Sequence, residues 1–156
     1  MKADEWWLDI TNNRNPDLKV GDPDKPYMLR WYIVPRNPIA NVYLHHFLRD
    51  DDDRALHDHP WDSQSVLLSG KLREHMPEGS RIITPGMVIN RKAEDCHRLE
   101  VLERGFTLFT TGPRVRDWGF HCPQGWVHWE DFVSPENVGE VGRGCGEYQP
   151  KDTNND

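Results

Sequence analysis

The chain has 156 residues, a formal net charge of -7 and 36% hydrophobic residues. This length suits one domain with its own core. The acidic balance argues against a nucleic-acid partner held by phosphate neutralisation. No apolar run approaches the roughly 18 residues of a membrane span, and the opening MKADEWWLDI lacks the apolar segment of a signal peptide. We therefore expect neither a nucleic-acid nor a membrane partner.

The three cysteines, Cys96, Cys122 and Cys145, are odd in number and lack CxxC spacing. This pattern predicts neither a disulfide framework nor a zinc knuckle. Unpaired cysteines are typical of a reducing compartment, so we expect a cytoplasmic protein.

Short strands joined by turns are the predicted architecture. Twelve prolines and twelve glycines are scattered through the chain, and helices tolerate such punctuation poorly. Residues 1–10 are expected to form a short helix or an edge strand, and residues 11–25 a loop. The runs YMLRWYIV at 27–34 and ANVYLHHFL at 40–48 are aromatic and β-branched, as strands are. Further strand candidates recur about every 8–12 residues, which is typical of an all-β sandwich or barrel.

These elements predict a single domain with three parts. Residues 1–26 are an N-terminal arm or loop, residues 27–133 the β-barrel, and residues 134–156 a C-terminal tail. The tail is polar and glycine-rich, and we expect it to be partly disordered.

The segment ALHDHPWD places His57 and His59 one residue apart. In a strand, residues i and i+2 point to the same face, so both imidazoles would enter one space. Imidazole is a common ligand for zinc, iron, nickel and copper. Two ligands do not complete a site, and two ordinary polar residues of a strand are the alternative. A third histidine, His97, opens a later strand candidate with Leu99 and Val101 on its own alternation.

These residues resemble the two motifs of the cupin superfamily, whose fold is a double-stranded β-helix, or jelly-roll barrel. The first cupin motif has HxH, then an acidic residue and then a glycine. This chain has the histidine pair, Ser63 and Gly70 at that spacing. The second motif has a Pro-Gly turn and a later histidine, which Pro85-Gly86 and His97 match. The matched region is about 53–101.

The resemblance implies that His57, His59 and His97 bind one divalent transition metal. Fe2+ is the favoured ion, and Zn2+, Ni2+ and Mn2+ are the alternatives. The chain departs from the motif at Ser63, where many cupins carry a glutamate ligand. Three interpretations follow: a three-histidine site, as in the thiol dioxygenases of this superfamily; a site completed by another acid; or a barrel that has lost its metal and only binds a ligand.

Other residues are candidates for the remaining roles. Asp62 or Glu74 is the acid that would reach the metal. Glu74 and Tyr43 are candidate catalytic groups. The candidate substrate-binding residues are Ser63, Arg91, Arg98 and Trp61. Since Arg98 follows His97 directly, strand alternation points it to the opposite face. Arg30, Arg49 and Arg54 are further cations for an anionic substrate.

The resulting functional hypothesis is a metal-dependent cupin enzyme acting on a small molecule, an oxidoreductase of oxygenase type. One alternative is a non-catalytic cupin that binds a sugar, a nucleotide or another small ligand. Another is a metal-independent sugar-nucleotide isomerase or epimerase, which would need a histidine paired with Asp58 or Asp62. A homodimer formed through sheet edges is also expected.

Overall fold

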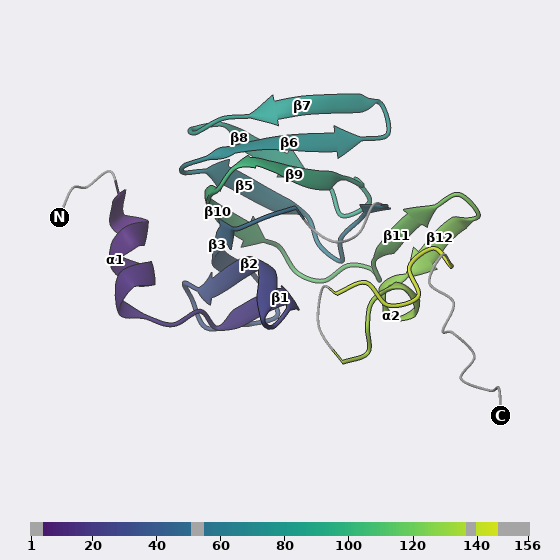
Figure 1. Cartoon of the computed structure of the whole chain (residues 1–156), viewed down its shortest axis with the longest axis horizontal. Helices are drawn as coiled ribbons and strands as arrows, with labels where there is room; N and C mark the ends of the chain where they lie inside the picture. Colours follow the sequence, from purple (N-terminus) through teal and green to yellow (C-terminus); the bar gives the residue numbers. More distant parts are fainter. Residues whose placement is uncertain (1–4, 51–54, 137–139, 147–156) are drawn as a thin grey trace.

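The computed structural model describes residues 5–50, 55–136 and 140–146. Strands dominate this part of the chain, as predicted, with a helix at each end (Figure 1). In chain order the elements are α1 (Trp6–Asn13), β1 (Leu18–Asp22), β2 (Lys25–Tyr32), β3 (Asn41–Phe47), β4 (Leu56–His57), β5 (Ser63–Leu67), β6 (Lys71–Met76), β7 (Gly79–Ile83), β8 (Val88–Arg91), β9 (Arg98–Glu103), β10 (Gly105–Thr111), β11 (Gly119–Cys122), β12 (Gly125–His128) and α2 (Trp129–Phe132).

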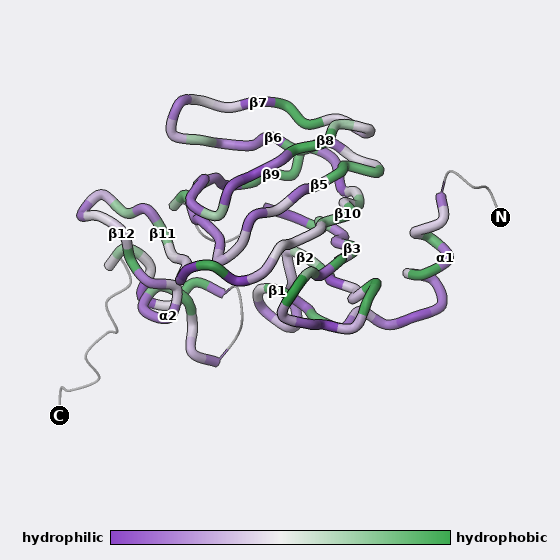
Figure 2. The backbone as a smooth tube through the Cα atoms, turned by 180° about the vertical axis from the view of Figure 1, so that it is seen from behind, coloured by the Kyte–Doolittle hydropathy of each residue, from purple (hydrophilic) through white to green (hydrophobic). Residues whose placement is uncertain are grey.

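The largest sheet has six strands in the order β1-β2-β3-β10-β5-β8, all paired antiparallel. Cross-strand register places Arg30, His45, Thr107 and Leu67 in one row. Because side chains alternate along a strand, each row lies on one face of the sheet. Figure 2 shows that hydrophobic and hydrophilic stretches both occur along the strands.

The inner face of this sheet packs on a second sheet, in the order β7-β6-β9. The apolar cluster between them joins Met28, Phe47 and Leu67 of the large sheet to Leu72 and Ile83 of the small one. Full burial of such a side chain contributes roughly 1.5–3 kcal/mol. This cluster holds the two sheets together and fixes which face of each strand is interior.

Helix α1 covers part of the outer face of the large sheet. Trp7 packs with Trp31, Leu44 and Phe106, and Leu44 is fully buried. Residues 1–26 were expected to be an arm or loop, yet their described part contains α1 and β1, and β1 pairs with β2. The aromatic and aliphatic residues of α1 are held by this tertiary packing.

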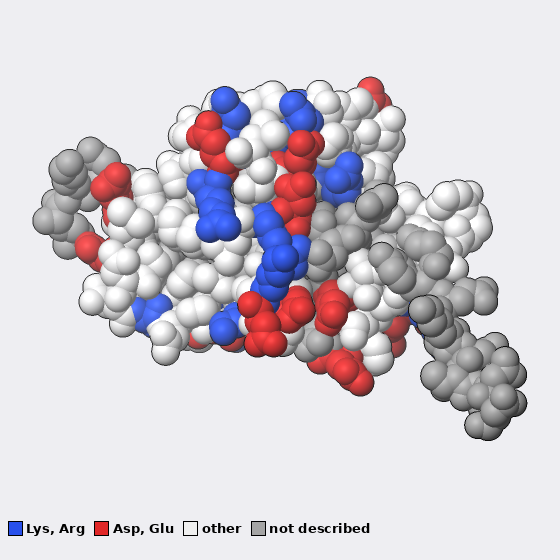
Figure 3. Space-filling view, in the orientation of Figure 1, with Lys and Arg blue, Asp and Glu red and all other residues white. Residues whose placement is uncertain are grey.

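The outer face of the β6–β9 pair is charged rather than apolar. Glu100 accepts hydrogen bonds from Arg73 at 3.0 Å and contacts the His75 ring at 2.8 Å. Figure 3 shows Lys and Arg side chains beside Asp and Glu side chains over this region. The face opposite the core is therefore a solvated surface.

Gly70 lies where β5 turns towards β6. Its φ is +88°, and an added Cβ would lie 2.7 Å from the carbonyl oxygen of Arg104. Only glycine tolerates both this backbone angle and this close approach. The glycine of the first motif therefore lets the chain entering β10 pass directly against the turn.

The third sheet, in the order β12-β11-β4, joins the C-terminal region to the barrel. Phe120 stacks on Phe132 of α2 with 3.6 Å between ring centroids. In Figure 1 this unit lies at the end of the molecule opposite α1.

Cys122 of β11 forms a disulfide with Cys145, with 5.5 Å between their Cα atoms. The prediction of no disulfide is therefore wrong for this pair, while Cys96 is free. The two partners are 23 residues apart and meet because a Val133–Val141 bridge folds the segment back on itself. The spacing of the cysteines in the sequence does not predict this contact, because the contact depends on the folding of the whole segment. Unpaired cysteines therefore no longer support a cytoplasmic setting, which stays a prediction.

Two further expectations concern the ends of the chain. The disorder expected for the end of the tail falls on residues 147–156, outside the described residues, whereas 140–146 are described. No helix in the described ranges is long and apolar enough to cross a membrane.

Candidate metal centre

His57, His59 and His97 come from three positions that the backbone brings together. His57 lies in β4, and its N–H and carbonyl exchange hydrogen bonds with His97 at 2.9 and 3.0 Å. The N–H of His59 donates to the carbonyl of Ala93 at 2.9 Å. The HxH segment is thereby fixed against the chain that leads into β9.

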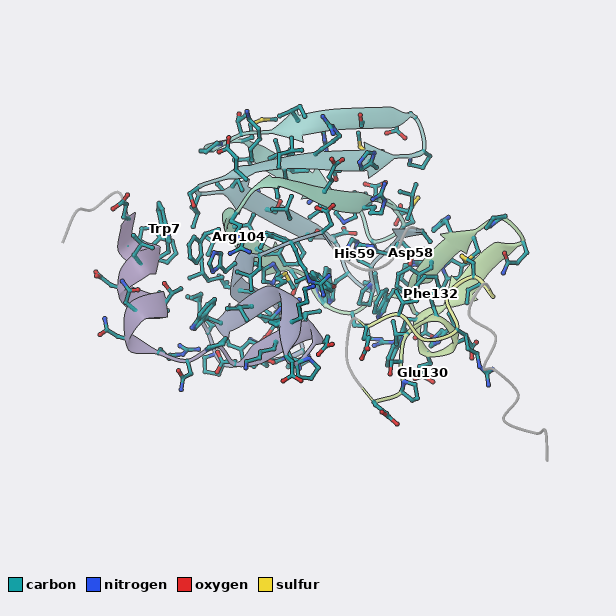
Figure 4. All side chains as sticks on the ribbon, in the orientation of Figure 1. Trp7, Asp58, His59, Arg104, Glu130 and Phe132 are labelled. Atoms are coloured by element: carbon teal, nitrogen blue, oxygen red, sulfur yellow. A yellow bond between two sulfur atoms is a disulfide. The ribbon has the colours of Figure 1, made fainter. Side chains whose placement is uncertain are left out.

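The three imidazole rings face one another. Their centroids are 5.0 Å apart for His57–His59, 4.9 Å for His57–His97 and 5.1 Å for His59–His97. One nitrogen of each ring lies within 4.8 Å of the others. Figure 4 shows His59 between the barrel strands and the β11–β12 hairpin. The predicted grouping of these three histidines is present in the structure.

Glu74 fixes the orientation of the His97 ring. Its carboxylate lies 2.7 Å from His97 Nδ1 and is 1% exposed. A carboxylate there accepts a hydrogen bond from Nδ1–H, which leaves the Nε2 lone pair of His97 free for a metal. Sequence reasoning named Glu74 as an acid or ligand but missed this positioning role.

Two arginines hold the Glu74 carboxylate in its charged form. Arg91 donates to it at 2.7 Å and Arg81 at 2.6 Å. Burial alone would raise the pKa of Glu74, but the hydrogen bond from His97 and the charge of Arg91 outweigh it and hold the pKa far below its usual range. Arg91, predicted to bind substrate, is therefore ion-paired with Glu74. Its guanidinium also donates to the hydroxyl of Ser65 at 3.2 Å.

The other two rings keep buried nitrogens without partners. Nδ1 of His57 and Nδ1 of His59 have no hydrogen-bond partner among the described residues. Burial, and then neighbouring positive charges, lower the pKa of both histidines well below the ordinary imidazole value. Burial also lowers the pKa of His97, against the raising effect of Glu74. All three rings are therefore neutral near pH 7, as metal ligands must be.

This donor set fits a divalent transition metal. Leaving a buried polar atom without a partner costs about 1–3 kcal/mol, and coordination through the unpartnered nitrogens of His57 and His59 would remove that cost. Three imidazoles, one of them oriented by a buried carboxylate, are a ligand set that iron, zinc, nickel and copper accept. In the described part of the chain, this is the group of His, Cys, Asp and Glu side chains close enough to share an ion.

Ser63 is the first residue of β5 and carries no charge. Its Oγ is buried and has no hydrogen-bond partner in the described ranges. Its neighbours across the strands are Thr111 and Arg91. The hydroxyl of Thr111 is also buried without a described partner. Where many cupins have a glutamate, this chain therefore has a small, neutral side chain whose hydroxyl has no described hydrogen-bond partner.

The remaining predicted residues occupy different places. Trp61 stacks on His59 at 5.2 Å, within reach of any molecule at the histidines. Arg98 lies on the outer face of β9, as alternation predicted, on the side away from the histidine cluster. Asp62 accepts from the N–H of Ala93 at 2.9 Å and pairs with Lys92. Tyr43 is buried on the inner face of β3, where its ring lies 4.5 Å from the guanidinium carbon of Arg30.

Asp58, between the two HxH histidines, turns to the other side. It accepts hydrogen bonds from Gly119 N–H at 2.8 Å and from the Trp126 indole at 3.0 Å, and it lies 3.0 Å from His121 Nε2. It therefore ties β4 to the β11–β12 hairpin. Sequence reasoning missed this role, because Asp58 lies far along the chain from all of these partners.

The chain has the double-stranded β-helix fold of the cupins. It is similar to an RmlC-like cupin from Shewanella frigidimarina at 14% identity, over 62% of this chain and 85% of that one, with a TM-score of 0.50. It is also similar to KdgF from Halomonas sp., at 16% identity over 68% and 94% of the two chains, with a TM-score of 0.50.

A third similar structure is the Fe(II) form of HppE, at 15% identity and a TM-score of 0.53. This chain is covered over 65% and spans 58% of HppE. Such identities establish the fold alone. No protein-family model and no curated protein matches the sequence. Fold and side chains together describe a protein of the cupin fold with a candidate three-histidine metal centre.

Proposed function

We propose that this protein is a mononuclear metal-dependent cupin enzyme that acts on a small molecule, with Fe2+ as its metal and an oxygenase-type reaction. The supporting observation is the cluster of His57, His59 and His97, with buried and unpartnered nitrogens on two of the rings. A divalent ion held by three neutral ligands keeps its full charge and supplies Lewis-acid activation or, as Fe2+, reactivity towards dioxygen.

The protein's own groups prepare the site for such chemistry. Glu74 holds the His97 ring in one tautomer and one orientation. Trp61 stacks on one face of His59 and supplies an aromatic surface beside the site. Burial keeps the imidazoles neutral and therefore competent to bind a cation. The similarity to the Fe(II) form of HppE is consistent with iron.

A non-catalytic cupin that binds a small ligand is the second candidate. Ser63 supports it, since a buried serine replaces the carboxylate that many cupins offer to a metal. The isomerase alternative needs a histidine paired with Asp58 or Asp62, and Asp58 does lie 3.0 Å from His121 Nε2. The same carboxylate accepts hydrogen bonds from Gly119 N–H and the Trp126 indole, so this pair also fastens the hairpin and is separate from the three clustered histidines. Asp62 pairs with Lys92 instead of a histidine.

Metal content, measured by inductively coupled plasma mass spectrometry after anaerobic loading with Fe2+, tests the proposal first. We expect close to one iron per wild-type chain and almost none in His59→Ala. His75→Ala is the matched control, because His75 faces Glu100 on the outer surface, and it should retain the metal. Equal metal in wild type and His59→Ala would contradict the proposal.

Oxygen uptake separates the two candidates. Iron-loaded protein is mixed with a panel of small thiols, amines and carboxylates in an oxygen electrode. The enzyme proposal expects uptake with at least one compound in wild type and His75→Ala, and none in His59→Ala. Binding of a compound without uptake by any variant would favour the ligand-binding cupin.

A further inference from the structure

Arg30 places a cation on the inner face of the large sheet without a counter-ion among the described residues. It lies in β2 on the same face as Met28, which belongs to the core between the sheets. Its Nε donates to His45 Nε2 at 2.9 Å, and its guanidinium carbon lies 4.5 Å from the centre of the Tyr43 ring. Both contacts orient the group, and neither neutralises it.

His45 acts as a neutral partner for this cation. It is 4% exposed, and burial and the charge of Arg30 hold the pKa of His45 well below its ordinary value. Because Nε2 accepts from Arg30, the ring proton is on Nδ1. Nδ1–H is therefore a second donor, on a ring that the contact with Arg30 holds in place. The His45 ring stacks on Phe109 at 5.1 Å.

Most of the N–H donors of Arg30 have no described hydrogen-bond partner. A guanidinium has five N–H donors in a planar fork, and the contact with His45 uses the one on Nε. Arg30 is partly buried, and a cation with limited access to water is normally paired with an anion. Arg36, exposed and without a described ion pair, is a second cation 5.8 Å from the Tyr32 ring, which in turn contacts Tyr43 at 5.6 Å.

An aromatic wall connects this cation to the histidine cluster. From His45, ring contacts run to Phe109 at 5.1 Å, from Phe109 to Trp61 at 5.4 Å, and from Trp61 to His59 at 5.2 Å. A molecule anchored at Arg30 could therefore lie along ring faces with its other end near His59. A planar anionic group matches the fork of Arg30.

We propose that Arg30 and His45 bind an oxyanion, a carboxylate or a phosphate, and that the substrate of this cupin carries such a group at the end remote from its reacting atoms. The substrate assignment rests on the proposed metal function. The oxyanion site itself stands on the contacts of Arg30 and His45 and is testable without metal.

The test uses chelator-treated, metal-free protein and two probes, inorganic phosphate and benzoate, followed by NMR. The Arg30 Nε–H resonance is assigned by its loss in Arg30→Gln. We expect at least one probe to shift this resonance and the His45 ring signals in a saturable manner. Arg30→Gln should weaken binding of that probe by at least about tenfold, the loss expected for charge-assisted hydrogen bonds. Arg30→Lys, which keeps the charge without the fork, should fall between the two.

Controls separate this inference from the proposed metal function. Arg73→Gln, on the outer face, should bind the probe as wild type does. His59→Ala should lose the metal and keep the oxyanion site, whereas Arg30→Gln should keep the metal. A probe that binds to a protein unable to hold metal would support the oxyanion site and contradict the enzyme proposal.

Two results would overturn the inference. One is an Arg30 resonance that neither probe moves, a measurement on wild type that does not depend on the folding of a variant. The other is equal probe affinity in wild type and folded Arg30→Gln. Selective binding of phosphate or of benzoate identifies which class of oxyanion the site prefers.

Discussion

Glu74 and Asp58 are both 1% exposed, and both carboxylates are surrounded by donors, yet they serve different regions. Glu74, on β6, contacts the Nδ1 of a candidate metal ligand and is flanked by two arginines. Asp58 follows β4 and receives donors from the C-terminal hairpin and from Arg116. One buried charge orients the site, and the other fastens a neighbouring segment to it.

The two carboxylates show how one extended segment serves both faces. His57 and His59 point to the interior, and Asp58 between them points outward, as the alternation of an extended chain requires. Figure 4 places Asp58 and His59 side by side, with Asp58 towards the hairpin. The segment HDH therefore supplies two candidate ligands and the anchor that fixes their backbone.

The largest expected effect distinguishes the two histidines that these carboxylates contact. His97→Ala should abolish stoichiometric metal binding, because it removes a ligand that Glu74 orients. His121→Ala should retain the metal, because His121 contacts Asp58 on the outward side. Metal analysis of the two variants checks this difference. Loss of metal in His121→Ala but not in His97→Ala would show that His121, and not His97, is needed for metal binding.

Removing each carboxylate charge should have different consequences. Glu74→Gln leaves the buried Arg91 without its counter-ion, which we expect to lower the free energy of unfolding by about 3–5 kcal/mol. It should also weaken metal binding about 10- to 100-fold, the usual effect of losing the partner of a ligating histidine.

Asp58→Asn provides the contrast. It should destabilise the protein, because Asp58 receives several donors from the hairpin, and it should speed amide hydrogen exchange in β11 and β12 while metal still binds at one per chain. Urea denaturation, metal competition and hydrogen exchange measure the three quantities. A metal affinity lowered more by Asp58→Asn than by Glu74→Gln would contradict the division of roles.

The pH dependence of stability should separate the buried histidines from the buried carboxylates. The pKa values of His45, His57, His59 and His97 are all lowered from 6.5. As the pH falls through that value the unfolded chain binds protons that the folded protein does not, so the stability of metal-free protein should fall. The slope is at most about 1.4 kcal/mol per pH unit for each histidine.

A second loss should follow at lower pH. The pKa values of Glu74 and Asp58 are lowered from 4.5 and 3.8, so their contributions are lost only as the pH falls below that range. Urea unfolding of metal-free wild type and Glu74→Gln between about pH 8 and pH 3 tests both losses. Equal stability of wild type at about pH 7 and about pH 5 would contradict the first.

The sequence predicted the histidine cluster more completely than it predicted the roles of the residues around the cluster. Strand alternation predicted that His57 and His59 share a face and that Arg98 points away from His97, and the structure agrees. The contact of Glu74 with His97 depends on the register in which β6 pairs with β9. That register comes from the packing of both strands onto the core, so no local sequence pattern predicts it.

The same reason explains the other surprises. Arg30 meets His45 because β2 and β3 pair with those two residues opposite each other. Cys122 meets Cys145 only after the C-terminal segment folds back. Long-range contacts of this kind follow from the assembled sheets, whereas motif spacing and alternation are local properties of the chain.

The smallest expected effect concerns Ser63, on the Glu74 side of the comparison, whose hydroxyl is buried without a described partner. Ser63→Ala removes an unsatisfied polar group, so stability should stay the same or rise by up to about 1 kcal/mol. Thr111→Val is the matched change on the neighbouring strand and should behave alike. Metal affinity should not change in either variant, because neither hydroxyl is among the proposed ligands. If Ser63→Ala instead weakens metal binding tenfold while Thr111→Val does not, then Ser63 belongs to the metal centre, and Glu74 is not the only group outside the three histidines that tunes it.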